Sequence, residues 1–279
     1  MSLISLNCRG CGEAATVREI RCIADSYNPS MLFLSETKMS RQRSEDLKWR
    51  LGFQNAIGVN SLGLSGGLVL LWKNGITVNL KSYSKFHIDV WVSEENGKVW
   101  RFTGFYGESV RTRRKESWRM LRFLRNQADL PWLCVGDFNE ILHVEEQMGG
   151  NDREEWCMSG FREAVEYCGF SDLGYRGLPF TWDNRREGSH NIKVRLDRAL
   201  GNESWLDLFG KSTATHVQIV ESDHCAVFVH VVPTGMPHGG GKVFRYENMW
   251  QRHHRYDEIV VGAWNSGCTN LGEVNANLE

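Results

Sequence analysis

Short apolar runs that end on a polar residue mark the first part of the chain. The segments SLISLN at residues 2–7 and MLFLSE at residues 31–36 are mostly apolar, which is typical of strands buried on both faces. They end on Asn7 and Glu36. Between them, after Glu13, apolar residues recur at helical spacing: Val17, Ile20, Ala24 and Tyr27. We therefore predict a strand, an amphipathic helix that ends near Asn28-Pro29, and a second strand.

A group of strand-like runs follows a polar stretch, residues 41–50, that predicts a helix. The runs cover residues 67–72, 76–83, 87–93 and 99–106. Asn74-Gly75 and Asn96-Gly97 lie between neighbouring runs, and such dipeptides favour hairpin turns. Because consecutive strands joined by short turns pair antiparallel, we expect mixed sheets rather than the parallel sheet of a doubly wound fold.

The stretch PWLCVGDFNEIL, residues 131–142, combines a buried strand with polar chemistry. Its apolar run from Trp132 to Val135 predicts a strand buried on both faces, and Gly136 ends it. Asp137 and Asn139 follow, at the position where α/β proteins often place their chemistry. This stretch alone leaves two interpretations open, a strand followed by an Asx turn or a catalytic loop. The other strand ends have to decide between them.

The later part of the chain continues the alternation of helices and strands. Two amphipathic helices are predicted, one burying Leu121, Leu124 and Ala128 and the other Phe161, Ala164, Val165 and Cys168. Asp197 lies in a predicted strand at residues 193–200, and Asp223 and His224 directly precede one at residues 225–232. We expect one domain at residues 1–232, a Gly/Pro-rich linker at 233–243, and a partly helical tail at 244–279 without a core of its own.

Composition restricts the class of protein. With 279 residues, 41% hydrophobic and 24% charged, the chain has the make-up of a soluble globular protein with a large core. No apolar run approaches the roughly 20 residues that span a bilayer, and the first residues lack a signal-peptide pattern, so we expect an intracellular protein. The net charge of −1 supplies no global basic field, so contact with phosphates has to come from local patches.

The eight cysteines are expected to be reduced core thiols, because several lie in apolar runs. Cys8 and Cys11 form a CxxC that could be half of a zinc site, a redox pair, or part of the core. We favour the core, because no second CxxC or His/Cys cluster accompanies the pair.

Polar residues able to act together in catalysis gather at the predicted strand ends: Asn7, Glu36, Tyr106, Asp137, Asn139, Asp197, Asp223 and His224. Singly, each has an ordinary explanation. Glu36 could cap a helix, Asp197 could pair with Arg195 or Arg198 on the surface, and His224 could be a core imidazole. Together they supply what phosphodiester hydrolysis needs, oxygen ligands for a hard cation and an imidazole that titrates near neutral pH.

The ordered motifs SLNCRG, FLSETK, FYG, GDFNEIL, RLDRAL and SDH resemble those of the endonuclease/exonuclease/phosphatase superfamily, which includes apurinic/apyrimidinic endonucleases and deoxyribonuclease I. Longer words such as GGLVLLW, SWRMLRFL and FREAVEYCGFSDLGYRGLPFTWDN are more similar to the endonuclease domain of plant non-LTR (LINE-type) retrotransposons. The resemblance covers about residues 1 to 232.

The resemblance implies a four-layer α/β sandwich, with two mixed β-sheets packed face to face, helices on the outside and the active site at one end of the sheets. It makes Glu36 the principal ligand of Mg²⁺, or of Mn²⁺, with Asn7 and Asp223 as the neighbouring metal ligands. At two positions, near Asn7 and after Tyr106, the sequence departs from the family's motifs. Arg9 stands where repair enzymes often have an acidic residue, and GES follows Tyr106 where many relatives have a proline. The number of metal ligands near Asn7 therefore stays open, and abasic-site repair is disfavoured.

The resemblance also assigns the catalytic roles. Asp137 would orient or deprotonate the attacking water, and Asn139 would hold the phosphate. His224 would contact the scissile phosphate, with Asp197 fixing its tautomer and raising its basicity. Tyr106 would donate to the phosphoryl oxygens or assist the leaving group.

DNA is the substrate that the resemblance implies. Two basic loops could grip it, through Arg111, Arg113, Arg114 and Lys115 on one side and Arg185, Arg186, Lys193 and Arg195 on the other. Solvated surface charge is the alternative for both loops. The implied task is to nick one target strand and leave a 3′-hydroxyl that primes reverse transcription. We expect a monomer, located in the nucleus with its substrate, whose element could continue into a reverse transcriptase domain.

Two other functions stay open at this stage. The same scaffold hydrolyses phospholipids and inositol phosphates, although the apolar lipid-facing loop that such members need is not visible between Met148 and Trp156. A decayed copy of an element could instead be an inert nucleic-acid-binding relic. Against decay, every motif position is filled.

Overall fold

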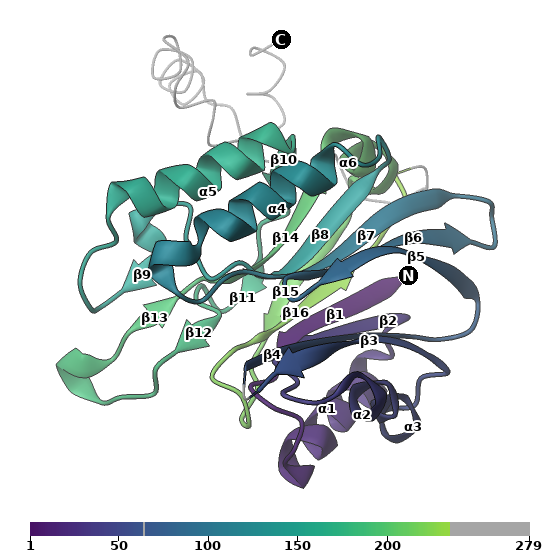
Figure 1. Ribbon diagram of the computed structural model, residues 1–279, viewed down its shortest axis with the longest axis horizontal. Helices are drawn as coiled ribbons and strands as arrows, with labels where there is room; N and C mark the ends of the chain where they lie inside the picture. Colours follow the sequence, from purple (N-terminus) through teal and green to yellow (C-terminus); the bar gives the residue numbers. More distant parts are fainter. Residues whose placement is uncertain (64, 235–279) are drawn as a thin grey trace, which may run out of the picture. The chain divides into compact units, whose positions relative to one another are not determined.

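Two β-sheets form the centre of the computed structural model, which describes residues 1–63 and 65–234. The first sheet has seven strands in the order β11-β15-β16-β1-β2-β4-β3 (Figure 1). In that order, the strands are Arg176–Gly177, Thr213–Val217, Ala226–His230, Ser2–Asn7, Met31–Ser35, Ser65–Trp72 and Asn55–Leu62. Within it, β1 and β2 are parallel, whereas β16 and β4 flank them antiparallel.

The second sheet has six strands in the order β10-β14-β8-β7-β6-β5. They are Phe170–Asp172, Asp197–Asn202, Trp132–Asp137, Val99–Tyr106, His87–Glu94 and Ile76–Ser84. Here β7 and β8 are the parallel pair, and β14 and β6 flank them antiparallel. A small third sheet joins β12 (Trp182–Asp183), β13 (Lys193–Val194) and β9 (Gln147–Met148).

Helices cover the outer face of each large sheet, on opposite sides in Figure 1. On the first sheet lie α1 (Ala14–Tyr27), α2 (Arg41–Glu45) and α3 (Leu47–Leu51), and on the second lie α4 (Lys115–Arg125) and α5 (Glu155–Tyr167). The short helix α6 (Glu203–Phe209) contributes Trp205 and Phe209 to the core between the sheets. Three 3₁₀ turns are η1 (Arg111–Arg113), η2 (Val144–Glu146) and η3 (Gly188–His190). The predicted four-layer α/β sandwich with two mixed sheets is therefore confirmed.

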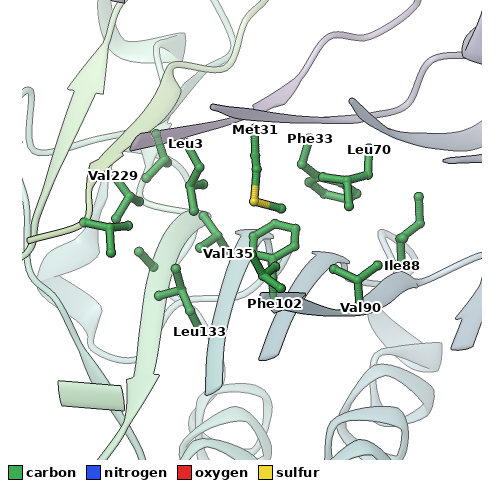
Figure 2. Close-up of a cluster of buried hydrophobic side chains, with 14 of the residues drawn as sticks. Leu3, Met31, Phe33, Leu70, Ile88, Val90, Phe102, Leu133, Val135 and Val229 are labelled. Atoms are coloured by element: carbon green, nitrogen blue, oxygen red, sulfur yellow. The ribbon is translucent and has the colours of Figure 1, made fainter. Parts of the chain in front are cut away.

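The core between the sheets holds them face to face. Leu3, Met31, Phe33 and Val229 of the first sheet meet Ile88, Val90, Phe102, Leu133 and Val135 of the second (Figure 2). Each such side chain contributes about 1.5–3 kcal/mol when fully buried. Gly104 gives Phe33 its room, because a Cβ there would lie 2.4 Å from the Phe33 ring. The sheets can thus approach closely at the strands that end in the candidate residues.

Strand direction gathers the candidate residues at one edge. Parallel pairing aligns Asn7 with Ser35 at the ends of β1 and β2, and Tyr106 with Asp137 at the ends of β7 and β8. The antiparallel neighbours begin where these strands end, so β14 pairs Asp197 with Asp137. Parallel strands thus supply their last residues and antiparallel strands their first residues to the same end of the sandwich.

Several local predictions need correction. Asn74-Gly75 is not a hairpin turn, because β4 before it and β5 after it belong to different sheets. Asn96-Gly97 does connect a hairpin, β6 with β7. The expected helix at residues 41–50 is two short helices, α2 and α3. The run 193–200 is divided between β13 and β14, which lie in different sheets, and strand β3 was not predicted.

The described residues belong to one compact unit, Met1–Gly235. From residue 235 on, the expected linker and tail lie outside the described residues. Among the residues that the structure describes, no helix has the length and apolarity to cross a bilayer.

Cys8 and Cys11 are both buried, with their Sγ atoms 3.3 Å apart and no disulfide between them. The hydrogen bond to Cys8 and burial raise the pKa of the Cys11 thiol far above its usual range. A thiol that does not ionise is a poor nucleophile and metal ligand, so the pair belongs to the core under α1.

The buried imidazole of His87 makes the fold sensitive to acid. Its two ring nitrogens lie 2.9 Å from the hydroxyls of Ser82 and Ser84, and burial lowers its pKa to about 4. Between pH 6.5 and about 4, the unfolded chain therefore binds a proton that the folded chain does not. Stability is lost as the pH falls through this range, by up to about 3 kcal/mol.

We expect His87→Gln to reduce this loss. The measurement is urea unfolding of wild type and variant at several pH values between 7 and 4, compared as the difference between the two proteins. His190→Gln, at an exposed position in η3, is the matched control. Identical pH dependence of wild type and His87→Gln would contradict the assignment.

Candidate active site

The side-chain amide of Asn7 joins two carboxylates from different sheets. Its Nδ2 atom donates to Glu36 Oε1 and to Asp137 Oδ2, both at 3.0 Å. Its Oδ1 accepts the backbone N–H of Arg9 at 3.2 Å, and Tyr106 donates its hydroxyl to Glu36 Oε1 at 2.9 Å. Asn7 therefore acts as a donor between the two carboxylates.

Glu36 is held on a strained turn after β2. Its φ is +53°, a left-handed conformation that a residue with a side chain rarely adopts. The next two backbone N–H groups, of Thr37 and Lys38, donate to the carbonyls of Gly67 and Gly66. Gly67 itself has φ +85° and lies so close that a Cβ would be 2.5 Å from Thr37 Oγ1. Gly66 and Gly67, at the start of β4, thus accept the backbone hydrogen bonds that fix the turn carrying Glu36.

The stretch after β8 is both an Asx turn and part of the site. The backbone N–H of Asn139 donates to Asp137 Oδ1 at 2.8 Å, and Asn139 has φ +56°. Its Nδ2 donates to the carbonyl of Gly107 at 2.9 Å and lies 3.3 Å from Asp137 Oδ2. The two interpretations of this stretch therefore describe one geometry, in which the turn fixes the Asp137 carboxylate.

His224 lies between two carboxylates. Its Nδ1 is 2.8 Å from Asp197 Oδ2, and its Nε2 is 4.0 Å from Asp137 Oδ2. Thr181 holds this end of β14, because its Oγ1 accepts the backbone N–H of Asp197 at 2.9 Å. Because the Asp197 carboxylate can only accept a hydrogen bond, Nδ1 of His224 carries a proton.

Burial and charge shift the proton affinities of this group. Burial opposes protonation of His224, but Asp197 and Asp137 outweigh it and raise the pKa of His224 to about 9. Burial, followed by the charge of Asp197, raises the pKa of Asp137 to about 7. Burial, with Glu36 and Asp137 nearby, raises the pKa of Tyr106. At neutral pH the site therefore contains an imidazolium, a neutral phenol donor and a carboxylate poised to exchange a proton.

The donor atoms fit a hard divalent cation at the mouth of the site. Glu36 Oε2 has no hydrogen bond among the described residues and lies 3.9 Å from Lys38 Nζ, so it is the oxygen of Glu36 that a cation would bind. Carboxylate oxygens are the ligands that Mg²⁺ and Mn²⁺ prefer. Asp137, Asp197 and His224 also form a compact group, with candidate ligand atoms within 4.8 Å of one another. We assign that group to proton exchange instead, because His224 is already bonded to Asp197.

Asp223 accepts hydrogen bonds from an arginine and a tryptophan side chain. Its Oδ2 accepts Arg9 Nη1 at 2.5 Å and Trp182 Nε1 at 2.7 Å, whereas its buried Oδ1 has no hydrogen-bond partner. Trp182 was missed because nothing in its neighbourhood in the sequence links it to Asp223, 41 residues later.

The arginines of the two predicted loops divide into exposed and largely buried side chains. Arg111 and Arg113 in η1, and Arg185 and Arg186 before η3, are exposed. Arg111 pairs with Glu154 and Arg113 with Glu116 at the surface, and Arg185 donates to the backbone carbonyls of Ile219 and Ser222. Arg114 is different, because its side chain is only 11% exposed and bonds Glu140 at 2.5 Å.

Arg195 is buried and does not belong to the contact surface that the sequence suggested. Its guanidinium bonds Glu146 at 3.0 Å and Asp172 at 2.9 Å, and Arg198 joins the same two carboxylates. These ion pairs satisfy its charge inside the protein, so we leave Arg195 out of the proposed DNA contacts.

Comparison with known families gives one match. The sequence model described as "Endonuclease/Exonuclease/phosphatase family" matches residues 4–224. Nucleases of this family are generally dependent on divalent metal ions. Comparison with curated proteins gave no match.

Solved structures with the same fold include several nucleases. A 3′-5′ exonuclease (NExo) from Neisseria meningitidis has a TM-score of 0.65 at 12% identity, covering 83% of this chain and 100% of that chain. An AP endonuclease from Archaeoglobus fulgidus has a TM-score of 0.63 at 14% identity, covering 83% and 99%. The endonuclease domain of TRAS1, a telomere-specific non-LTR retrotransposon, has a TM-score of 0.62 at 14% identity, covering 82% and 97%. At these identities the likeness establishes the fold.

The pKa of His224 provides a direct check of the site. In metal-free buffer we expect its imidazole to titrate near pH 9, and Asp197→Asn to lower that pKa by about 1–2 units. Because this pKa lies above the unfolded value of 6.5, the stabilisation is fully present below pH 6.5 and is lost as the pH rises through about 9. The measurement is an NMR titration of the imidazole ring protons.

Asp207→Asn, a change at an exposed position of α6, is the matched control and should leave the His224 titration unchanged. An unchanged His224 pKa in Asp197→Asn would show that the Asp197 carboxylate does not sustain the imidazolium.

Proposed function

The chain belongs to the endonuclease/exonuclease/phosphatase family, and from that premise we propose that it is a divalent-metal-dependent DNA endonuclease, related to those of plant non-LTR retrotransposons. It nicks one strand and leaves a 3′-hydroxyl. The observation that carries the proposal is the hydrogen-bonded series Tyr106, Glu36, Asn7 and Asp137. The bonded pair His224 and Asp197 lies beside it, with His224 Nε2 4.0 Å from Asp137 Oδ2.

The protonation states of His224 and Asp137 assign a different catalytic role to each. His224 keeps its proton up to about pH 9, so it acts as a cation toward the phosphoryl oxygens and not as the base. Asp137, with a pKa of about 7, is then the group that accepts the proton of the attacking water. Asn7 and Asn139 hold this carboxylate in place through Nδ2 and backbone N–H donors.

Glu36 and Tyr106 act on the other side of the phosphate. Glu36 would hold the divalent ion, Mg²⁺ or Mn²⁺, which supplies positive charge to the phosphoryl oxygens when bound. Tyr106 keeps its phenolic proton, because burial and the charge of Glu36 raise its pKa. This proton is donated to Glu36 Oε1 in the free site, and with substrate bound it would turn to a phosphoryl oxygen or to the leaving group. Asn139 supports this arrangement by fixing Asp137, because its Nδ2 donates to the carbonyl of Gly107 and to Asp137 Oδ2.

DNA as the substrate is supported by the exposed arginines of two separate loops, Arg111 and Arg113 in η1 and Arg185 and Arg186 before η3. Structures of the same fold include a Neisseria 3′ phosphatase described as bound to a product DNA hairpin and the TRAS1 retrotransposon endonuclease domain. With DNA as substrate, we place the chain in the nucleus as a monomer, and a reverse transcriptase would use the 3′-hydroxyl that it leaves.

The nicking of supercoiled plasmid in Mg²⁺ tests the activity. We expect Glu36→Gln and His224→Ala each to reduce the rate by on the order of 100-fold or more, because each removes a charge that acts on the transition state. Glu145→Gln and His230→Ala, at exposed positions, are matched controls and should nick like wild type.

The product distinguishes this enzyme from other members of the scaffold. A DNA polymerase should extend the nicks directly, because they carry a 3′-hydroxyl. Full activity of either site variant would refute the residue assignments. Nicks that need phosphatase treatment before extension, or release of phosphate from inositol lipids without nicking, would refute the proposed reaction.

Binding to DNA at different salt concentrations tests the basic loops. Replacing Arg111 and Arg113 together, or Arg185 and Arg186 together, by Ala should weaken binding. Each pair should also reduce the slope of log K against log salt by about 2, one for each lost phosphate contact. Arg43→Ala, an exposed change in α2, is the control.

Arg195→Ala should behave differently from the loop variants. Because it leaves Glu146 and Asp172 with less buried counter-charge, it should lower the free energy of unfolding by about 3–5 kcal/mol. Its salt slope in DNA binding should equal that of wild type. A reduced slope for Arg195→Ala, or an unchanged slope for both loop pairs, would refute this division of the arginines.

A further inference from the structure

Arg9 occupies the side of the site where Asp223 lies. Its Nη1 is 2.5 Å from Asp223 Oδ2, although the two residues are 214 positions apart. Trp182 Nε1 donates to the same oxygen at 2.7 Å. One oxygen of Asp223 thus receives two donors, and one of these donors carries a full positive charge.

The other oxygen of Asp223 is closed as well. Its Oδ1 has no exposed surface and no hydrogen-bond partner. Neither oxygen of Asp223 is therefore open to a hydrated cation, because Oδ2 accepts from Arg9 and Trp182 and Oδ1 is buried. A buried carboxylate with an unpaired oxygen needs a counter-charge, and Arg9 supplies one from within the chain.

The backbone fixes Arg9 in this position. Arg9 has φ +49°, a left-handed conformation, and its N–H donates to Asn7 Oδ1 at 3.2 Å. The same Asn7 donates to Glu36 and Asp137, so Arg9 is tied to the centre of the site. Its side chain is nevertheless 55% exposed, and among the described residues only its Nη1 makes a side-chain hydrogen bond. The remaining guanidinium donors have no protein partner among the described residues, so they are available to a phosphate.

We propose that Arg9 is a built-in cation that takes the place of a second metal ion, so that the chain binds a single divalent ion, at Glu36. The inference rests on the proposed function and deepens it, since it fixes the number of ions and adds Arg9 as a positioning residue for Asp223 and the phosphate. A guanidinium can neutralise phosphoryl oxygens, as a second ion would, without being recruited from solution.

Counting bound ions tests the proposal without any turnover. Isothermal titration with Mn²⁺, combined with electron paramagnetic resonance of the free ion, should give one Mn²⁺ per wild-type chain and none in Glu36→Gln. Arg9→Gln should bind a second, weaker Mn²⁺, because Asp223 then lacks its counter-charge. Arg9→Lys keeps the charge and should bind one. The double variant Arg9→Gln with Asp223→Asn should return to one.

Wild type that binds two Mn²⁺ or none, or a folded Arg9→Gln variant that still binds one, would overturn the proposal. Asp223→Asn alone tests it even if Arg9→Gln does not fold, as judged by circular dichroism. Since Asp223 is not a ligand here, the Kd for Mn²⁺ should change by less than about threefold. Weakening by more than about tenfold would make Asp223 a ligand and overturn the proposal. If one ion binds but no plasmid is nicked, the proposed function fails and the inference about Arg9 stands.

Discussion

Buried negative charge is the constraint on which the site depends. Three nearly inaccessible carboxyl groups, those of Asp137, Asp197 and Asp223, lie at one end of the sandwich. A carboxylate away from water is stable only where donors or cations meet it. Asn7, the backbone of Asn139, His224 and Arg9 meet these groups. Because Asn7 belongs to one sheet and Asp137 to the other, this bonding also ties the two sheets together.

The sandwich makes that arrangement possible through strand direction and close packing. Each large sheet has a parallel pair at its centre, and the ends of these pairs carry Asn7 and Glu36 in one sheet and Tyr106 and Asp137 in the other. The apolar core between the sheets sets their separation, and Gly104 allows Phe33 to fill it. Chemistry and packing therefore share the same strands, so a change in the core would also displace the donors of the site.

The sequence predicted the layers of the fold better than it predicted the hydrogen bonds and ion pairs of the candidate residues. Apolar runs that end on polar residues identify buried strand ends without knowledge of their partners, and the structure places Glu36 directly after β2 and Asp137 at the end of β8. Three-dimensional partners decide the rest. Nothing local distinguishes Arg195, which is buried against Glu146 and Asp172, from the exposed Arg185. Likewise, Asn74-Gly75 has the composition of a hairpin turn but leads from one sheet to the other.

The small sheet of β9, β12 and β13 lies between the surface loop of residues 184–192 and the pair Asp197 and His224. Its strands pair with one another, and Thr181 anchors its base by accepting the N–H groups of Leu196 and Asp197, both at 2.9 Å. The segment between Asp183 and Lys193 projects beyond this anchor (Figure 1). Insertions and deletions there change the reach and shape of the projection while Asp197 and His224 keep their places. The shape of this projection can therefore vary independently of the residues at the base of the small sheet.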